Sequence, residues 1–353
     1  MRVAFYVRYA KNDRRNGGVE ETMITYEKHM KKKGIETLFV VRGNIIKNVS
    51  ELKDFKPDVI LISKFLDLYE GYFLKKAMRV PVLVFAHDEF DVKGFKPPFN
   101  FFSILNTKKL SKKVDAIVAL NKNVYNLVKE ETGVVPYLSY SGFDTPNCPK
   151  KTEYRCYSAE GRPFQFISIG RFVKEKGVDT VADAFWGFNM TYPNSKCIIC
   201  GDGPYRKEFM EKYHHLIEDG RLEVPGYVPE VEKLLAESDI FLNMTRAKEG
   251  LVFANILALR VGVPVYTLDS GAVSEVIKKY ENGYVFNDMP TSIVSEVVWH
   301  VIENEVIFRY APALKNRADK GFETAEFFSG ERATEDLLKV MKSVLNDNDY
   351  YGI

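Results

Sequence analysis

The chain has 353 residues, of which 46% are hydrophobic and 28% are charged, and its 50 lysines and arginines nearly balance its 48 aspartates and glutamates. This composition excludes a disordered or fibrous protein, and the length favours two domains of similar size. No apolar run approaches the roughly 20 residues that span a bilayer, and the N-terminal stretch resembles a strand rather than a signal peptide, so we expect a cytoplasmic protein.

Short apolar runs alternate with amphipathic stretches along the whole chain. In the first half we expect strands at 3–7, 37–41, 58–63, 81–85 and 116–120, and helices at 19–33, 65–78, 100–113 and 123–131. In the second half we expect strands at 164–169, 196–200, 222–228, 239–243, 264–268 and 284–286, and helices at 178–190, 205–217, 230–236, 251–260, 272–280 and from about 330 onward. Continuously apolar strands between helices predict an α/β protein with two Rossmann-like domains, each built on a parallel sheet.

The polar stretch 144–163 has no hydrophobic periodicity and carries three prolines, so we interpret it as a linker. We therefore expect an N-terminal domain at 1–150, a C-terminal domain at 160–330, and a terminal helix and tail at 331–353. Ligands of open parallel sheets bind at the carboxyl ends of the strands. If the two domains face one cleft, the functional residues should lie in loops that follow strands.

The near-neutral total charge hides a difference between the two parts of the chain. Residues 1–150 carry 26 lysines and arginines against 17 aspartates and glutamates, a net charge of +9. The remaining residues carry 24 against 31, a net charge of −7. Individual lysine clusters are usually solvated, but this split in sign indicates that the N-terminal half meets an anionic partner.

Cys197 and Cys200 form a CxxC motif inside the predicted strand 196–200. Three residues apart on a strand, the two thiols point to opposite faces, which suits neither a metal ion nor a redox pair. The sequence offers no second CxxC motif and no histidine pair to complete a zinc site. We therefore expect two buried thiols, no metal site and no cofactor.

The stretch SIGRFVKEKGVD (168–179) runs from a predicted strand through a loop into a predicted helix. The loop places Arg171 and Lys176 between Gly170 and Gly177. The first N–H groups of a helix lack partners and its dipole is positive at that end, so added cations favour a phosphate or diphosphate. A solvated loop with ordinary surface charges explains the same residues, and the rest of the chain must decide between the two interpretations.

Two loops of the first half carry candidate ligand-binding groups. Gly17 and Gly18 open the first helix, where absent side chains let main-chain N–H groups approach an anion or a sugar, although a tight turn explains them too. The chain has no GxGxxG motif there and no acid after the second strand, which argues against a dinucleotide site. His87 follows the strand 81–85 and is either a packed residue or a donor to a sugar hydroxyl, while the acids beside it could cap a helix.

Three loops of the second half also follow predicted strands. They are GDGP (201–204), VPGYVP (224–229) and the loop in which Glu249 and Gly250 precede the predicted helix 251–260. A carboxylate at a helix N-terminus can simply stabilise the dipole. Alternatively, Glu249 reaches a ligand in the same cleft as the cationic loop.

The order and spacing of these motifs resemble those of family 4 glycosyltransferases, which have the GT-B fold, use nucleotide-sugar donors and retain the anomeric configuration. The resemblance covers nearly the whole chain. It rests on GGVE (17–20), HD (87–88), SGFD (141–144), GRFVKEKG (170–177), GDGP (201–204), GYVP (226–229), SDIFLNMTRAKEG (238–250), GVPV (262–265), SGAVSEVI (270–277) and FFSGERATEDLLKVMKSV (327–344). The last segment is similar to the family's tail helix, which returns to the N-terminal domain.

The resemblance implies a role for each matched residue. Arg171 and Lys176 would neutralise the donor diphosphate without a metal ion. Glu249 would hold hydroxyls of the transferred sugar, and His87 would contact the sugar near the reacting carbon. Further donor- and nucleotide-binding roles are implied for Gly17, Gly18, Gly170, Gly201, Asp202, Gly203, Tyr227, Val228, Gly250 and Leu251.

One position departs from the family pattern. The family has a second glutamate eight positions after the first, which binds the donor ribose, and this chain has Leu257 there. Asn255 is polar and close in sequence, so we include it among the donor-binding candidates. The departure also leaves open a non-catalytic relative that only binds a nucleotide or a sugar.

The resemblance thus implies a retaining, metal-independent glycosyltransferase that moves a sugar from a nucleotide-diphosphate sugar to a glycan, lipid or protein-linked acceptor. The charge of +9 in the N-terminal half suits an anionic lipid surface or a polyanionic glycan, so we also expect peripheral contact with the inner membrane face and no nucleic-acid partner. A GT-B epimerase would need more acid–base groups, and a phosphorylase would need a pyridoxal lysine.

Overall fold

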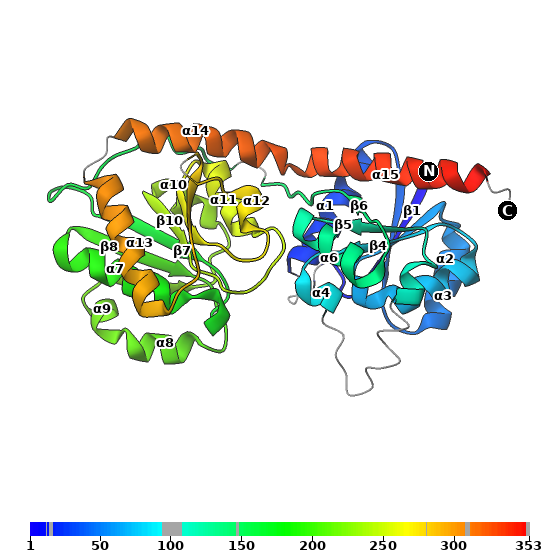
Figure 1. Ribbon diagram of the computed structural model, residues 1–353, viewed down its shortest axis with the longest axis horizontal. Coiled ribbons are helices and arrows are strands. Elements are labelled where there is room, and N and C mark those ends of the chain that lie inside the picture. The colour runs from blue at the N-terminus through cyan, green and yellow to red at the C-terminus, as the bar shows by residue number, and fades with distance from the viewer. Residues whose placement is uncertain are drawn as a thin grey trace. The chain divides into compact units, whose positions relative to one another are not determined.

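The computed structural model describes residues 1–11, 13, 17–93, 108–145, 148–279, 281–307 and 311–350, without the side chains of 311 and 347–350. The chain divides into two units. The first holds Met1–Asp144, Lys248–Leu251 and the C-terminal part from Phe328, and the second holds Thr145–Ala247 and Val252–Phe327. Figure 1 shows one sheet in each unit, surrounded by that unit's helices. Both sheets have six parallel strands, in the orders β2-β1-β3-β4-β5-β6 and β12-β11-β10-β7-β8-β9, which confirms the predicted pair of Rossmann-like domains.

The first unit follows a strand–helix alternation. Its strands are β1 (Arg2–Val7), β2 (Glu36–Val41), β3 (Val59–Ile62), β4 (Val82–Ala86), β5 (Ala116–Ala119) and β6 (Tyr137–Leu138). Its helices are α1 (Gly18–Lys32), α2 (Ile45–Phe55), α3 (Leu68–Met78), α4 (Glu89–Lys93), α6 (Lys122–Thr132) and α15 (Gly330–Tyr350), and a 3₁₀ turn at Phe65–Asp67 precedes α3.

The second unit repeats the alternation. Its strands are β7 (Phe164–Ile169), β8 (Ser195–Cys200), β9 (Leu222–Gly226), β10 (Ile240–Asn243), β11 (Val265–Leu268) and β12 (Gly283–Phe286). Its helices are α7 (Val178–Thr191), α8 (Arg206–Lys212), α9 (His214–Glu218), α10 (Val231–Glu237), α11 (Phe253–Val261), α12 (Val273–Val276), α13 (Thr291–Val306) and α14 (Ala311–Phe327), and a 3₁₀ turn at Lys174–Lys176 precedes α7.

All predicted strands are present, but the helix predictions need correction. The short strand β6 and the helices α2, α13 and α14 were not predicted. The predicted helix 272–280 is only the single turn α12, because the Asn282 side chain binds the carbonyl of Val276 at 3.0 Å and the N–H of Lys278 at 2.7 Å. The predicted helix 251–260 begins only at Phe253. The prediction of a helix at 100–113 lies largely outside the described residues.

The first sheet is buried on both faces, which explains why its strands are apolar throughout. Along β1, Ala4 and Tyr6 contribute to one apolar cluster, whereas Val3 and Phe5 contribute to another. The second of these clusters includes Leu337 and other residues of α15, packed with residues of α1. The tail helix is therefore part of the core of the first unit.

The segment that the sequence indicates as a linker is instead attached to the second unit. Asp239, which is buried, forms ion pairs with Arg155 at 2.7 Å and with Arg162 at 3.1 Å. The main-chain N–H of Lys151 donates to the carbonyl of Val261 at 2.7 Å. The structure thus divides the chain at Asp144, and the residues after it belong to the second unit rather than to a free linker or to the first domain.

Candidate functional site

Three loops meet at the carboxyl edge of the second sheet, where β7, β8 and β9 end. The N–H of Gly170 donates to the carbonyl of Cys200 at 3.0 Å, and the N–H of Gly201 donates to the carbonyl of Gly226 at 2.7 Å. A further bond joins the N–H of Phe172 to the carbonyl of Asp202 at 3.0 Å. The predicted phosphate loop, the GDGP loop and the GYVP loop therefore form one edge, held together by main-chain hydrogen bonds.

Two glycines of this edge are required by close approach. Gly201 has a φ of +137°, and a Cβ there would collide with the carbonyl of Gly170. Gly177 has a φ of +65°, and a Cβ there would collide with the carbonyl of Met244, which follows β10. Side chains are excluded at both positions because the backbones touch.

The cations of the phosphate loop lie at the start of α7. Arg171 is exposed, and among the described residues its guanidinium has no hydrogen bond or ion pair. Lys176 is half-buried, in the turn that Gly177 closes before Val178 begins the helix. Lys174, in contrast, is engaged in an exposed ion pair with Glu208 at 3.0 Å. This arrangement of a helix N-terminus, an accessible arginine and a lysine can bind an anion.

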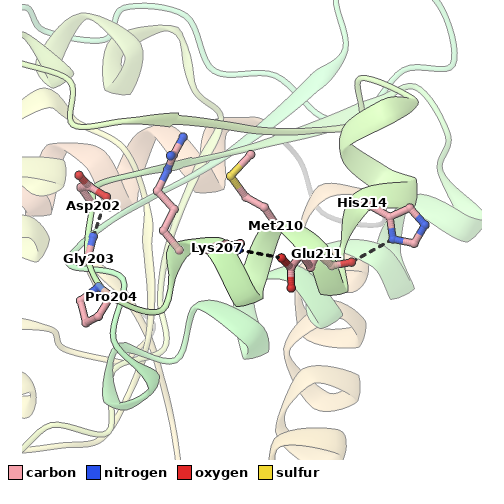
Figure 2. A pocket seen from close by; sticks show the side chains of 8 residues that line it. Asp202, Gly203, Pro204, Lys207, Met210, Glu211 and His214 are labelled. Atoms are coloured by element: carbon pink, nitrogen blue, oxygen red, sulfur yellow. Dashed lines mark hydrogen bonds and ion pairs between the residues drawn. The ribbon is translucent and has the colours of Figure 1, made fainter.

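A pocket of about 530 Å³ opens beside the GDGP loop (Figure 2). Part of the predicted nucleotide-binding loop lines it together with one side of α8 and the start of α9. The lining residues are Asp202, Gly203, Pro204, Arg206, Lys207, Met210, Glu211 and His214. The predicted Tyr227 and Val228 are not among the lining residues described here, and Tyr227 is 77% exposed.

His87 follows β4 in the first unit and is 8% exposed. Its Nε2 lies 2.8 Å from the carbonyl oxygen of Ser63, which can only accept, so Nε2 carries the proton. Burial, and secondarily the charge of Lys64, lowers the pKa of His87 to about 3, so the ring is neutral. The expected donation to a sugar hydroxyl is therefore wrong, because the remaining ring nitrogen, Nδ1, is an acceptor.

The loop of Glu249 and Gly250 is grouped by the structure with the first unit. A Cβ on Gly250 would collide with the carbonyl of His87, to which the Asn121 side chain donates at 3.1 Å. The structure thus brings His87 and the Glu249 loop together. Glu249 is half-buried and lies before α11, whose N-cap is Val252, so it does not cap that helix.

Asp88 has the capping role that the sequence allowed for the acids beside His87. Its Oδ1 accepts the N–H of Asp91 at 2.7 Å, at the start of α4. Also after a strand of the first sheet, β1, α1 begins at Gly18 after the N-cap Gly17. A Cβ on Gly17 would meet no described atom within 4 Å. Packing within the described residues therefore does not require a glycine there.

The structure corrects the interpretation of α11. Asn255 is 1% exposed, and its Oδ1 accepts the Nδ2 of Asn243 at 2.7 Å. The prediction that Asn255 binds the donor is therefore wrong, since its side chain lies in the interior of the second unit. Leu257 is half-exposed and does not belong to the buried core.

The prediction that Cys197 and Cys200 are buried thiols is confirmed. Cys197 and Cys200 are buried, and burial raises the pKa of the Cys200 thiol to about 11. Among the described residues no group of three or more metal-ligating side chains occurs. Within the same residues, no helix is both long and apolar enough to cross a membrane.

Two residues at these edges were missed by the sequence analysis. Asn121 caps α6 and also holds the His87 carbonyl, and its place directly after a predicted strand could have revealed it. Asp91 accepts the N–H of His87 at 3.2 Å and is buried. No signal in the sequence separates Asp91 from the other acids near it.

Comparison with known proteins identifies relatives of this chain. The model of a family described as glycosyl transferases group 1 matches residues 151–318. N-acetyl-alpha-D-glucosaminyl L-malate synthase of Bacillus anthracis is 27% identical over 183 residues, 52% of this chain and 46% of that protein. Alpha-monoglucosyldiacylglycerol synthase of Acholeplasma laidlawii is 31% identical over 146 residues, 39% of this chain and 34% of that protein. The match thus spans less than half the length of either relative.

Among solved structures, HepE from Anabaena in complex with UDP is similar, with a TM-score of 0.74 and 16% sequence identity. The match covers 97% of this chain and 100% of that chain. The two Rossmann-like units of this chain and its similarity to HepE define the GT-B fold. The match of residues 151–318 to the glycosyl transferases group 1 agrees with the family that the motifs predict.

Proposed function

We propose that this chain is a glycosyltransferase that moves a sugar from a UDP-sugar to an acceptor, with retention of configuration and without a metal ion. The observation that carries the proposal is the loop 170–177, which presents Arg171 and Lys176 beside the N-terminus of α7. This loop lies in the segment that matches the family model. The UDP bound to the similar protein HepE supports uracil as the base of the donor.

The leaving diphosphate gains negative charge as its bond to the sugar breaks. Arg171 and Lys176 stabilise that charge, together with the unpaired N–H groups at the start of α7. The main chain that carries them is held by the close contacts of the neighbouring glycine loops. These cations supply the positive charge that a metal ion supplies in metal-dependent transferases.

The transferred sugar is oriented by acceptor groups of the first unit. His87, neutral and protonated on Nε2, accepts a hydrogen bond from a sugar hydroxyl through Nδ1. Glu249 accepts others through its carboxylate, and the main-chain N–H groups of Gly250 and Leu251 donate to sugar oxygens. Gly17 leaves room for donor or acceptor at the N-terminus of α1, where Gly18 begins the helix.

The acceptor is a glycan or a lipid, presented at an anionic membrane surface on the cytoplasmic side. The first 150 residues have an excess of positive charge, and α3 exposes Tyr69 by 68% and Phe73 by 45% beside the exposed Lys76. Aromatic side chains with lysines are typical of surfaces that lie in a membrane interface. The lipid acceptor is also consistent with the name of the Acholeplasma laidlawii relative. Flotation with anionic vesicles, compared with neutral ones, tests this contact.

A thermal-shift screen followed by product analysis tests the proposed reaction. UDP and one UDP-sugar should raise the melting temperature more than GDP, ADP or their sugars, because a ligand stabilises the folded state that binds it. With that donor, NMR of the product or of the hydrolysed sugar should show the anomeric configuration of the donor. An inverted product, or stabilisation by another nucleotide alone, would contradict the proposal.

A non-catalytic nucleotide-binding relative is the second candidate, favoured by Leu257 in place of the ribose-binding acid. The two candidates differ in turnover. A transferase releases UDP from its UDP-sugar slowly even without an acceptor, whereas a binder stabilised by the same ligand releases none.

A further inference from the structure

One buried carboxylate joins the ends of β3 and β4 in the first unit. Asp91 is 2% exposed, and its Oδ2 accepts the N–H of Phe65 at 3.1 Å and that of His87 at 3.2 Å. Its Oδ1 accepts the N–H of Leu66 at 3.2 Å. A single side chain therefore binds three main-chain donors from the two loops that follow these neighbouring strands.

The same two loops are joined by a second interaction in the opposite direction. The ring of His87 donates from Nε2 to the carbonyl of Ser63, which lies two residues before the first N–H group that Asp91 binds. The main chain of Ser63 is itself fixed, since its N–H donates to Tyr6 of β1 at 3.0 Å. The orientation of the ring, and the tautomer that leaves Nδ1 as an acceptor, thus depend on the loop that Asp91 binds.

We propose that Asp91 is a positioning residue for glycosyl transfer, which acts through His87 and the turn 63–66 without touching donor or acceptor. This inference rests on the proposed role of His87 in transfer. The carboxylate fixes the main chain of His87, and the turn that it binds presents the carbonyl that orients the ring. Loss of this carboxylate should misalign Nδ1, although the ring itself is unchanged.

The environment of Asp91 makes its charge sensitive to pH. The charged or titratable groups that face it are Asp88 on the same turn, Lys64 after β3, Arg8 after β1, and His87. Burial raises the pKa of Asp91 to about 7, and the charge of Asp88 acts in the same direction, whereas the hydrogen bonds from Phe65 and His87 and the charge of Lys64 oppose the rise. A protonated carboxyl is a weaker acceptor than a carboxylate, so the acid form binds the three N–H groups less strongly.

The sign of the effect on stability follows from this raised pKa. Between about pH 4 and pH 7 the folded state binds the proton more strongly than the unfolded chain, whose aspartates titrate near 3.9. The contribution of Asp91 to stability therefore falls as the pH rises through that window. The three hydrogen bonds are strongest in the charged form, above about pH 7, where the buried charge lowers the stability of the folded state.

Asp91→Asn tests the proposal, because it keeps the size of the side chain but removes one acceptor and the titration. We expect kcat to fall by about tenfold to a hundredfold, the acid limb of the wild-type rate profile near pH 7 to disappear, and the amides of residues 65, 66 and 87 to exchange faster with deuterium. The matched control is Asp115→Asn. Asp115 also accepts a main-chain N–H, from Val82 at 2.9 Å, but it lies before β5, at the opposite end of the strands. This variant should lose stability without a change in the acid limb.

A measurement on the wild-type protein keeps the proposal testable if Asp91→Asn does not fold. Protection of the amides of residues 65, 66 and 87 should increase as the pH rises through about 7, after correction for intrinsic exchange. The proposal is overturned if that protection is independent of pH, or if a folded Asp91→Asn keeps the wild-type acid limb. Absence of turnover with every UDP-sugar would contradict the proposed function instead, while the exchange data would still decide whether Asp91 holds these loops.

Discussion

The two units hold their sheet edges in different ways. At the edge of the second sheet, loops bind one another through main-chain groups, and glycines such as Gly201 permit the contact. At the edge of the first sheet, side chains of Asp91, Asn121 and His87 bind the main chain of neighbouring loops. The edge of the second sheet is rigid, because its backbones touch and leave no space between them. The edge of the first sheet depends on the protonation states of side chains, so it can change with pH.

The largest effect should come from removing a glycine from the second edge. Gly201→Ala should lower the free energy of unfolding by about 3 kcal/mol and abolish UDP binding, since a Cβ meets the Gly170 carbonyl at a φ of +137°. Gly133→Ala is the matched control, because Gly133 has a φ of +70° but open space around it. It should lose only about 1 kcal/mol. Equal losses in chemical denaturation would show that backbone strain, not contact, explains the glycine.

At the same edge, the loss of one charged side chain should lower the rate of transfer without lowering the stability of the fold. Arg171→Ala should reduce transfer by about a hundredfold to a thousandfold, because one preorganised group no longer stabilises the leaving diphosphate. Its melting temperature should stay the same, as Arg171 is exposed. Lys174→Ala is the control, since Lys174 is in the same loop but pairs with Glu208. Steady-state kinetics with equal losses in both variants would contradict a specific role for Arg171.

A smaller effect, a gain in UDP affinity, is expected from a substitution on α11. Leu257→Glu should tighten UDP binding by about tenfold to a hundredfold, because a hydrogen bond to a charged group contributes about 1.5–3 kcal/mol. Leu257 is only partly buried, so a carboxylate at this position keeps contact with solvent. Ala254→Glu, on the same helix and also half-exposed, is the control. Calorimetric titration that finds no gain for Leu257→Glu, or the same gain for both variants, would show that no ribose-binding position is vacant at Leu257.

The smallest effect, none, is expected on treatment with EDTA. If Arg171 and Lys176 stabilise the diphosphate, chelation should leave the transfer rate unchanged. Loss of activity that Mn²⁺ or Mg²⁺ restores would contradict the metal-independent mechanism. A catalytically inactive preparation with the same melting temperature serves as the blank for hydrolysis of the donor.

Sequence patterns revealed the fold and the second edge better than the first edge. Strands that are buried on both faces require apolar residues, so they can be recognised in the sequence. A φ of +137°, as at Gly201, favours glycine, so this position can be recognised as well. Asp91 cannot be recognised in this way, since its role comes from donors 25 and 26 residues earlier in the chain. The direction of the His87 hydrogen bond was likewise set by Ser63, which only the folded structure brings near.

The wrong prediction for Asn255 has a physical origin in α11. The sequence analysis chose Asn255 because it is polar and close in sequence to Leu257, without knowing which way its side chain points. In the structure the helix begins at Phe253, and its rotation turns Asn255 inward toward Asn243 and leaves Leu257 half-exposed. A shift of the helix start changes which side chains face outward, and composition alone does not fix that start.

The return of α15 to the first unit limits how such proteins can be recombined. Residues of this last helix, among them Leu337 and Met341, pack with Met23 and Tyr26 of α1. A chimera that joins the first 144 residues of this chain to the remainder of another transferase would leave that apolar surface facing a foreign helix. The middle segment can therefore be exchanged between relatives, provided that the original C-terminal helix is kept with its own N-terminal partner.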